Sequence, residues 1–153
     1  MPYLIDGHNL IPKVGLSLGD LDVEDDLIEK LQTFCRIRRT TVEIYFDGGL
    51  PGQPSRGKYG SVKTFFAQKG KIADEAIEDR LQKLGKTAKN WGVVSSDHRV
   101  QVAARESHAR SFSSEEFSRL MMETMLKNMD QVDDEDAVSP EDVTNWLKEF
   151  GQE

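Results

Sequence analysis

Short apolar runs alternate along the chain with longer stretches in which apolar side chains recur every three or four residues. The short runs are rich in β-branched and aromatic residues and predict five strands, at residues 3–5, 41–46, 62–66, 91–94 and 109–112. Strands that alternate with helices are typical of βαβ units and of a mostly parallel sheet. The pattern therefore predicts an α/β fold, and the length of 153 residues predicts one compact unit.

Three amphipathic stretches predict helices between and after these strands. The first lies between the first two strands and carries Leu27 and Leu31 on one side. The second is expected to begin at Asp74. The third is expected to begin at Ser113, where Glu116 three residues later completes a capping box. In contrast, the segment between Asp47 and Val62 has five glycines, two prolines and no helical periodicity, and we interpret it as a mobile loop.

Charge is distributed unevenly along the chain. The net charge of −7 arises largely from residues 130–153, which hold nine acidic residues and one lysine, whereas residues 36–119 hold 16 basic and 10 acidic residues. The centre of the chain is therefore basic, which suits a polyanionic partner better than the net charge suggests.

The single cysteine excludes an internal disulfide framework. The N-terminal residues lack a signal-peptide pattern, and no apolar stretch approaches the roughly 20 residues of a membrane span, so we expect a cytoplasmic protein without a membrane partner.

Aspartates follow the predicted strands at the points where those strands end. Asp6, Asp47 and Asp97 follow the first, second and fourth strands, and Asp74 opens a helix after the third. Because the carboxyl ends of parallel strands form one edge of a sheet, these four side chains should lie together and should need a cation to offset their repulsion. Carboxylate oxygens favour Mg²⁺ or Mn²⁺ as that cation. Alternatively, any one of these aspartates could be an ordinary turn residue or helix cap. Asn9 could hydrogen-bond a carboxylate or a metal-bound water.

Four segments in series resemble a known family. They are residues 5–10 (IDGHNL), 46–48 (FDG), 73–77 (ADEAI) and 93–97 (VVSSD), and together they are similar to the YacP-like branch of the NYN domains, within the PIN-like ribonucleases. The resemblance covers residues 2 to about 128. It implies a three-layer PIN-like domain over residues 1–129, with a central parallel five-stranded sheet in the order 3-2-1-4-5 flanked by helices.

The same resemblance implies a function and assigns roles to the aspartates. The implied activity is metal-dependent endonucleolytic cleavage of RNA, with Asp6, Asp74 and Asp97 as the principal metal-site acids and Asn9 and Asp47 in support. A translation-linked RNA, messenger or ribosomal, and association with the ribosome are compatible with the family. A non-catalytic RNA-binding module of the same fold is the alternative. A nucleotide-binding α/β protein is disfavoured because the chain has no GxGxxG or GxxxxGK[ST] motif.

Basic residues near each aspartate segment are candidates for holding RNA. Each could also be an ordinary surface residue, but an aromatic side chain and glycines accompany the cations in the segment after Asp47, a combination that suits base stacking and close approach of phosphates. The predicted RNA-binding residues are Arg56, Lys58, Tyr59, Lys69, Lys71, Arg99 and Arg105.

The end of the chain, from Asp130 onward, is expected to lie outside the family resemblance. Residues 130–138 predict an acidic linker, and residues 139–151 predict a short amphipathic helix with Trp146, Leu147 and Phe150 on one side. Three roles stay open. The helix could dock on the domain, it could mediate homodimer formation or contact with another partner, or the acidic segment could occupy the RNA-binding groove as an RNA mimic.

Overall fold

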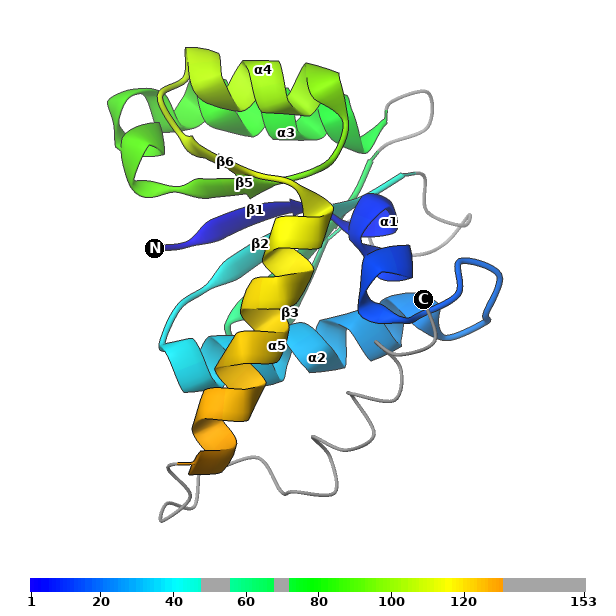
Figure 1. The fold of residues 1–153 in the computed structure, drawn as a ribbon. Helices are drawn as coiled ribbons and strands as arrows, with labels where there is room; N and C mark the ends of the chain where they lie inside the picture. Colours follow the sequence, from blue (N-terminus) through cyan, green and yellow to red (C-terminus); the bar gives the residue numbers. More distant parts are fainter. Residues whose placement is uncertain (48–55, 68–71, 131–153) are drawn as a thin grey trace.

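The computed structural model describes residues 1–47, 56–67 and 72–130 (Figure 1). Several predicted features lie outside the described residues: most of the glycine-rich segment after Asp47, the cations Lys69 and Lys71, the acidic linker and the C-terminal helix. Within the described part of the chain, no helix combines the length and the apolar character needed to cross a membrane.

A six-stranded sheet forms the centre of the molecule. Its strands lie in the order β3-β4-β2-β1-β5-β6. Their bounds are β1 Tyr3–Asp6, β2 Val42–Phe46, β3 Arg56–Tyr59, β4 Val62–Phe66, β5 Gly92–Val94 and β6 Arg110–Phe112. The pairs β4–β2, β2–β1, β1–β5 and β5–β6 are parallel, and these five strands correspond to the five that the apolar runs predict.

The prediction of a wholly parallel, five-stranded sheet is wrong at one edge, where β3 pairs antiparallel with β4. The residues between them are Gly60 and Ser61, and Gly60 has a φ of +63°, a backbone conformation that suits a tight hairpin turn. The interpretation of this whole segment as a loop is therefore wrong for Arg56–Tyr59. This strand lies at the edge of the sheet with mostly exposed side chains, so it needs no apolar pattern. Its glycine and polar residues therefore gave no strand signal in the sequence.

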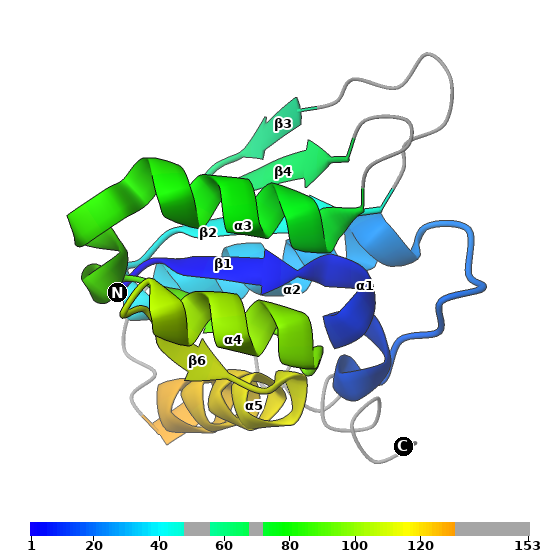
Figure 2. The same cartoon turned by 90° about the horizontal axis from the view of Figure 1, so that it is seen from above.

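Helices cover both faces of the sheet, as an α/β fold predicts. The helical elements are α1 Gly7–Leu10, the 3₁₀ helix Ile11–Val14, α2 Val23–Arg38, α3 Ala73–Leu84, the 3₁₀ helix Gly85–Asn90, α4 His98–Glu106 and α5 Ser114–Asp130. Helices α3 and α4 lie on one face, and α2 and α5 lie on the other (Figures 1 and 2). The strand side chains alternate between two cores: Ile5 and Ile44 face α2 and α5, whereas Leu4 and Tyr45 face α3 and α4.

The predicted capping box at the start of α5 is present. The backbone N–H of Glu116 donates to Ser113 Oγ at 3.0 Å, and the backbone N–H of Ser113 donates to Glu116 Oε1 at 3.3 Å. Farther along this helix, Phe117 and Met121 are buried against α2 and the sheet, as their spacing predicts. Local sequence signals were therefore sufficient to place this helix.

Gly7 allows α1 to follow β1 without a spacer. A Cβ atom at Gly7 would collide with the aromatic ring of Phe46 at the end of β2. The missing side chain lets the chain turn directly from the sheet into α1, which carries Asn9.

Replacing Gly7 with alanine should therefore destabilise the fold, because the Phe46 ring must shift to admit the new methyl group. We expect Gly7→Ala to lower the free energy of unfolding by about 1–3 kcal/mol in a urea titration. Gly19→Ala is the matched control, because a Cβ there meets nothing within 4 Å. Equal stability of the two variants would contradict this account of the close approach.

Candidate active site

The four predicted acids lie at the carboxyl edge of the sheet. Asp6 is the last residue of β1, and Asp47 follows β2 directly. Asp97 caps α4 after β5, and Asp74 is the second residue of α3. Because β1 pairs in parallel with both β2 and β5, the ends of these strands meet on the side of the molecule where α3 and α4 begin (Figure 2).

The charges of these acids act on one another. Asp6 is only 6% exposed, and burial raises the pKa of its carboxyl to about 6, with the hydrogen bond from Ser95 opposing this rise and the negative charges of Asp74 and Asp47 adding to it. The pKa of Asp74 is also raised, first by partial burial and then by the charges of Asp97 and Asp47. Acids from four separate segments are thus near enough for their charges to interact, and we call Asp6, Asp47, Asp74 and Asp97 the acid cluster.

Ser95 connects two of the acids. Its hydroxyl donates a hydrogen bond to Asp6 Oδ2 at 3.0 Å and accepts one from the backbone N–H of Asp97, also at 3.0 Å. Ser95 is 1% exposed, so both bonds are protected from water. Asp97 Oδ1 in turn accepts the backbone N–H of Arg99 at 2.8 Å, which caps α4. The role of Ser95 is not among those predicted from the sequence, although a small polar residue between a buried strand and Asp97 was a usable signal.

Asp47 supports the start of another helix. Its Oδ1 accepts the backbone N–H of Ala73 at 2.7 Å, and this bond holds the first turn of α3, which carries Asp74. Its Oδ2 lies 3.7 Å from His8 Nδ1, and the His8 ring packs on Phe46 with 5.1 Å between ring centroids. The alternative interpretation as a helix cap therefore holds for Asp97, which caps its own helix, whereas Asp47 bonds the first turn of α3 from a distant segment and so positions Asp74.

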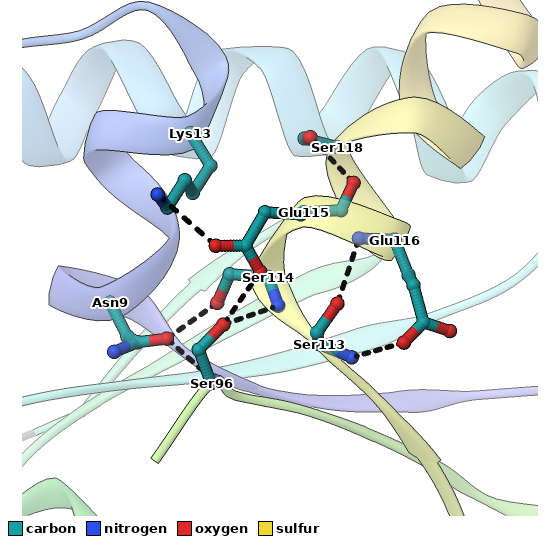
Figure 3. Close-up of polar contacts among 8 residues, drawn as sticks. All are labelled: Asn9, Lys13, Ser96, Ser113, Ser114, Glu115, Glu116 and Ser118. Atoms are coloured by element: carbon teal, nitrogen blue, oxygen red, sulfur yellow. Dashed lines mark hydrogen bonds and ion pairs between the residues drawn. The ribbon is translucent and has the colours of Figure 1, made fainter.

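Asn9 connects α1 to two other segments. Its Oδ1 accepts hydrogen bonds from the backbone N–H of Ser96 at 2.7 Å and from the hydroxyl of Ser114 at 2.5 Å (Figure 3). This carbonyl is therefore engaged with the loop after β5 and with the start of α5, while the backbone N–H of Asn9 donates to the Asp6 carboxylate and opposes the rise in its pKa. In the same network, Glu115 contacts Lys13 at 3.1 Å, and the backbone N–H groups of the helix start, Lys13 and Ser96 lower the pKa of Glu115 to about 2.

The predicted RNA-binding residues are spread over several surfaces. Arg56, Lys58 and Tyr59 are exposed on β3. Arg99 lies beside the acids and makes two hydrogen bonds to Glu78, at 2.5 and 3.1 Å, so part of its guanidinium is already paired with an acid. Arg105 is in the last turn of α4, at the end of that helix away from Asp97.

The carboxylate oxygens of the acid cluster are suited to a hard divalent cation, although the side chains do not surround a single metal position. Within residues 1–47, 56–67 and 72–130, no three His, Cys, Asp or Glu side chains lie together in a group that could hold a metal ion. Mg²⁺ does not require such a cage, because it is usually bound by one or two carboxylates and keeps several waters for exchange with substrate phosphates. Asp6 and Asp74, each with a like charge nearby that raises its pKa, fit that mode of binding.

The burial of Asp6 predicts a pH-dependent stability. Its pKa of 3.8 when unfolded rises to about 6 in the fold, so the folded protein holds a proton that the unfolded chain releases between these values. Stability therefore falls as pH rises through that interval, by up to about 3 kcal/mol, and stays lower above it. In EDTA, Asp6→Asn should raise the melting temperature at pH 8 and change it little at pH 4. Asp20→Asn, at an exposed position, is the control, and an equal effect of Asp6→Asn at both pH values would contradict the prediction.

Comparison with known proteins agrees with this architecture. A structure of Rae1 (YacP) from Bacillus subtilis is 25% identical, with a TM-score of 0.70 over 86% of this chain and 79% of that chain. A structure of a mutant of Rae1 (YacP) is 20% identical, with a TM-score of 0.64 over 96% of this chain and 98% of that chain. A search of curated proteins found no significant match. The family model described as YacP-like NYN domain matches residues 3–150, beyond residue 128 where the resemblance was expected to end. The chain therefore belongs to the YacP-like NYN domain family.

Proposed function

We propose that this protein is a divalent-metal-dependent endoribonuclease whose active site is the acid cluster. The observation that carries the proposal is the position of four carboxylates, from four separate segments, at the carboxyl edge of the sheet, where burial and neighbouring negative charges raise the pKa values of Asp6 and Asp74. Such an arrangement costs stability in the absence of a cation, and titratable groups perturbed in this way cluster at functional sites. Membership of a ribonuclease family supports RNA as the substrate.

The residues of the chain have distinct roles in this proposal. The metal ion, Mg²⁺ or Mn²⁺, would be held by Asp6, Asp74 and Asp97, with Asp47 in support. When bound, it would stabilise the phosphate oxygens as a Lewis acid and lower the pKa of a bound water. Ser95 keeps the Asp6 carboxylate and the backbone of Asp97 in fixed relation. Asp74, whose pKa is raised, is placed to accept a proton at its carboxylate.

The wider setting of the enzyme is part of the same proposal. Residues 1–129 form the nuclease domain, and the acidic linker and C-terminal helix follow it as a docking, dimerisation or inhibitory segment. The substrate is messenger or ribosomal RNA, encountered in the cytoplasm and in association with ribosomes. Deletion of residues 130–153 distinguishes the three roles of the end of the chain. Higher nuclease activity of the folded, shortened protein would indicate inhibition by this segment. An altered mass in solution would indicate dimerisation, and a lowered melting temperature would indicate docking on the domain.

The activity predicts divalent-ion-dependent cleavage of unstructured RNA. The wild-type protein should cut such RNA internally in Mn²⁺ or Mg²⁺ and not in EDTA, and Asp97→Asn should reduce the rate by at least about 100-fold, since it removes a charge from the metal site. Asp20→Asn, prepared in the same way, should cleave like the wild type. Equal activity of Asp97→Asn and wild type would show that the activity comes from a contaminant.

Binding of the metal predicts a second effect that does not depend on catalysis. Mn²⁺ at 100 times its dissociation constant should stabilise the wild-type fold by about 2.7 kcal/mol, and this increase in stability should be smaller in Asp74→Asn. If Mn²⁺ leaves the wild-type melting temperature unchanged and no cleavage occurs while RNA still binds, the protein is a non-catalytic RNA-binding module.

The cations of β3 are proposed to hold the substrate. Because Arg56 and Lys58 are exposed on this edge strand, the double variant Arg56→Ala, Lys58→Ala should weaken RNA binding and flatten its dependence on salt by about 1.4 in the log–log slope. The pair Arg36→Ala, Lys127→Ala removes the same charges from exposed positions on α2 and α5 and is the matched control. Unchanged binding by the β3 variant would remove these two residues from the site.

A further inference from the structure

In the part of the chain that the structure describes, no helix covers the far side of the sheet face that carries α3. Helix α3 packs over β1 and β2, while β4 and β3 extend beyond it (Figure 2). The side chains on this uncovered part come from alternate positions of the two strands, and we call it the open sheet face: Arg56 and Lys58 of β3, and Lys63 and Phe65 of β4. A cleft of about 420 Å³ separates it from α3, whose Arg80 and Lys83 line the opposite side.

An aromatic stack crosses this surface. The rings of Tyr45 and Phe65 lie nearly parallel, with centroids 4.9 Å apart and an interplanar angle of 14°. The guanidinium of Arg56 lies 5.9 Å from the centroid of the Phe65 ring. Tyr45 is buried and Phe65 is partly exposed, so a ligand can reach the stack from the side of Arg56 by displacing the guanidinium of that exposed residue.

The charge of the cleft favours a polyanion. Glu43 is 7% exposed and accepts two hydrogen bonds from Arg80, at 2.9 and 3.0 Å, so this acid is already neutralised. Apart from that pair, the described acid lining the cleft is Asp79, whereas Arg56, Lys63 and Lys83 line it as cations. Lys58 lies directly opposite Lys63 in the strand register and adds a further positive charge. This basic surface belongs to a protein of net charge −7.

The cleft leads toward the acid cluster. Ala67, which follows β4, and Ala76, two residues after Asp74 in α3, line its end at the carboxyl edge. Lys63 and Lys83 line it farther from that edge, since Lys83 is nine residues, about 13 Å, beyond Asp74 along α3. A strand held at the acids could therefore continue along this surface.

We infer that the open sheet face is a binding site for single-stranded RNA that extends from the acid cluster. One unpaired base takes the outer face of Phe65 in place of the Arg56 guanidinium, which moves to the outer side of the base, and Lys63 and Lys83 contact the flanking phosphates. The inference rests on the proposed ribonuclease function for the identity of the substrate. In this inference, the residues that favour unpaired RNA lie outside the acid cluster and are Phe65, Lys63 and Lys83.

The test measures binding in EDTA, where metal-dependent cleavage does not occur. Fluorescence anisotropy of the full-length protein with a labelled 12-nucleotide oligouridine should show at least 10-fold weaker binding by Phe65→Leu, which keeps apolar bulk but removes the aromatic face. The variant Lys63→Ala, Lys83→Ala should flatten the salt dependence by about 1.4 in slope, and Lys89→Ala, Lys127→Ala, at exposed positions outside the cleft, should leave it unchanged. Circular dichroism confirms that each variant is folded.

The outcomes separate this inference from the proposed function. If wild-type protein cleaves RNA with Mn²⁺ and both cleft variants bind and cleave like wild type, the open sheet face is not the RNA site, although the nuclease proposal stands. If wild type binds RNA without cleaving it, and the cleft variants lose binding, the nuclease proposal fails and the inference stands. A blunt RNA duplex that competes as well as the single strand would overturn the stacking of an unpaired base.

Discussion

The Asp6 carboxylate is buried at the end of β1 within range of the negative charges of Asp74 and Asp47, and burial together with this repulsion raises its pKa to about 6. Parallel pairing of β1 with both β2 and β5 enforces this proximity, because it directs the ends of neighbouring strands to one edge. The fold thus keeps several like charges close together at the carboxyl edge of the sheet, which costs stability. A cation bound at this edge during function would offset their repulsion.

Much of the surrounding polar structure holds these acids in place. The hydroxyl of Ser95 contacts Asp6 and the backbone of Asp97, Asp47 holds the first turn of α3, and Asn9 ties α1 to the loop after β5 and to α5. Apart from the bond between Ser95 and Asp97, these bonds join segments that are far apart in sequence. The site is therefore preorganised by backbone and side-chain hydrogen bonds, and a small displacement of any one segment would move an acid.

The cations that line the cleft beside α3 belong to the basic central part of the chain. The buried pair between Glu43 and Arg80 neutralises one acid, so that the remaining cations face the surface that Phe65 partly exposes. The cleft and the acid cluster are adjacent because β2 and α3 contribute to both. In the proposed enzyme, cations attract the RNA and aromatic stacking selects an unpaired base, while the acids provide the metal site.

The sequence by itself determined the five parallel strands, the three main helices and the place of Asp6, Asp47, Asp74 and Asp97 at one edge, because apolar periodicity and strand-end position are local properties. It did not show that Arg56–Tyr59 is a strand, since an exposed edge strand needs no apolar pattern. Only the tertiary structure showed that Ser95 links two acids, that Glu78 pairs with Arg99, and that Phe65 stacks between Tyr45 and Arg56. These contacts join residues on different elements, and their existence depends on strand order and helix packing.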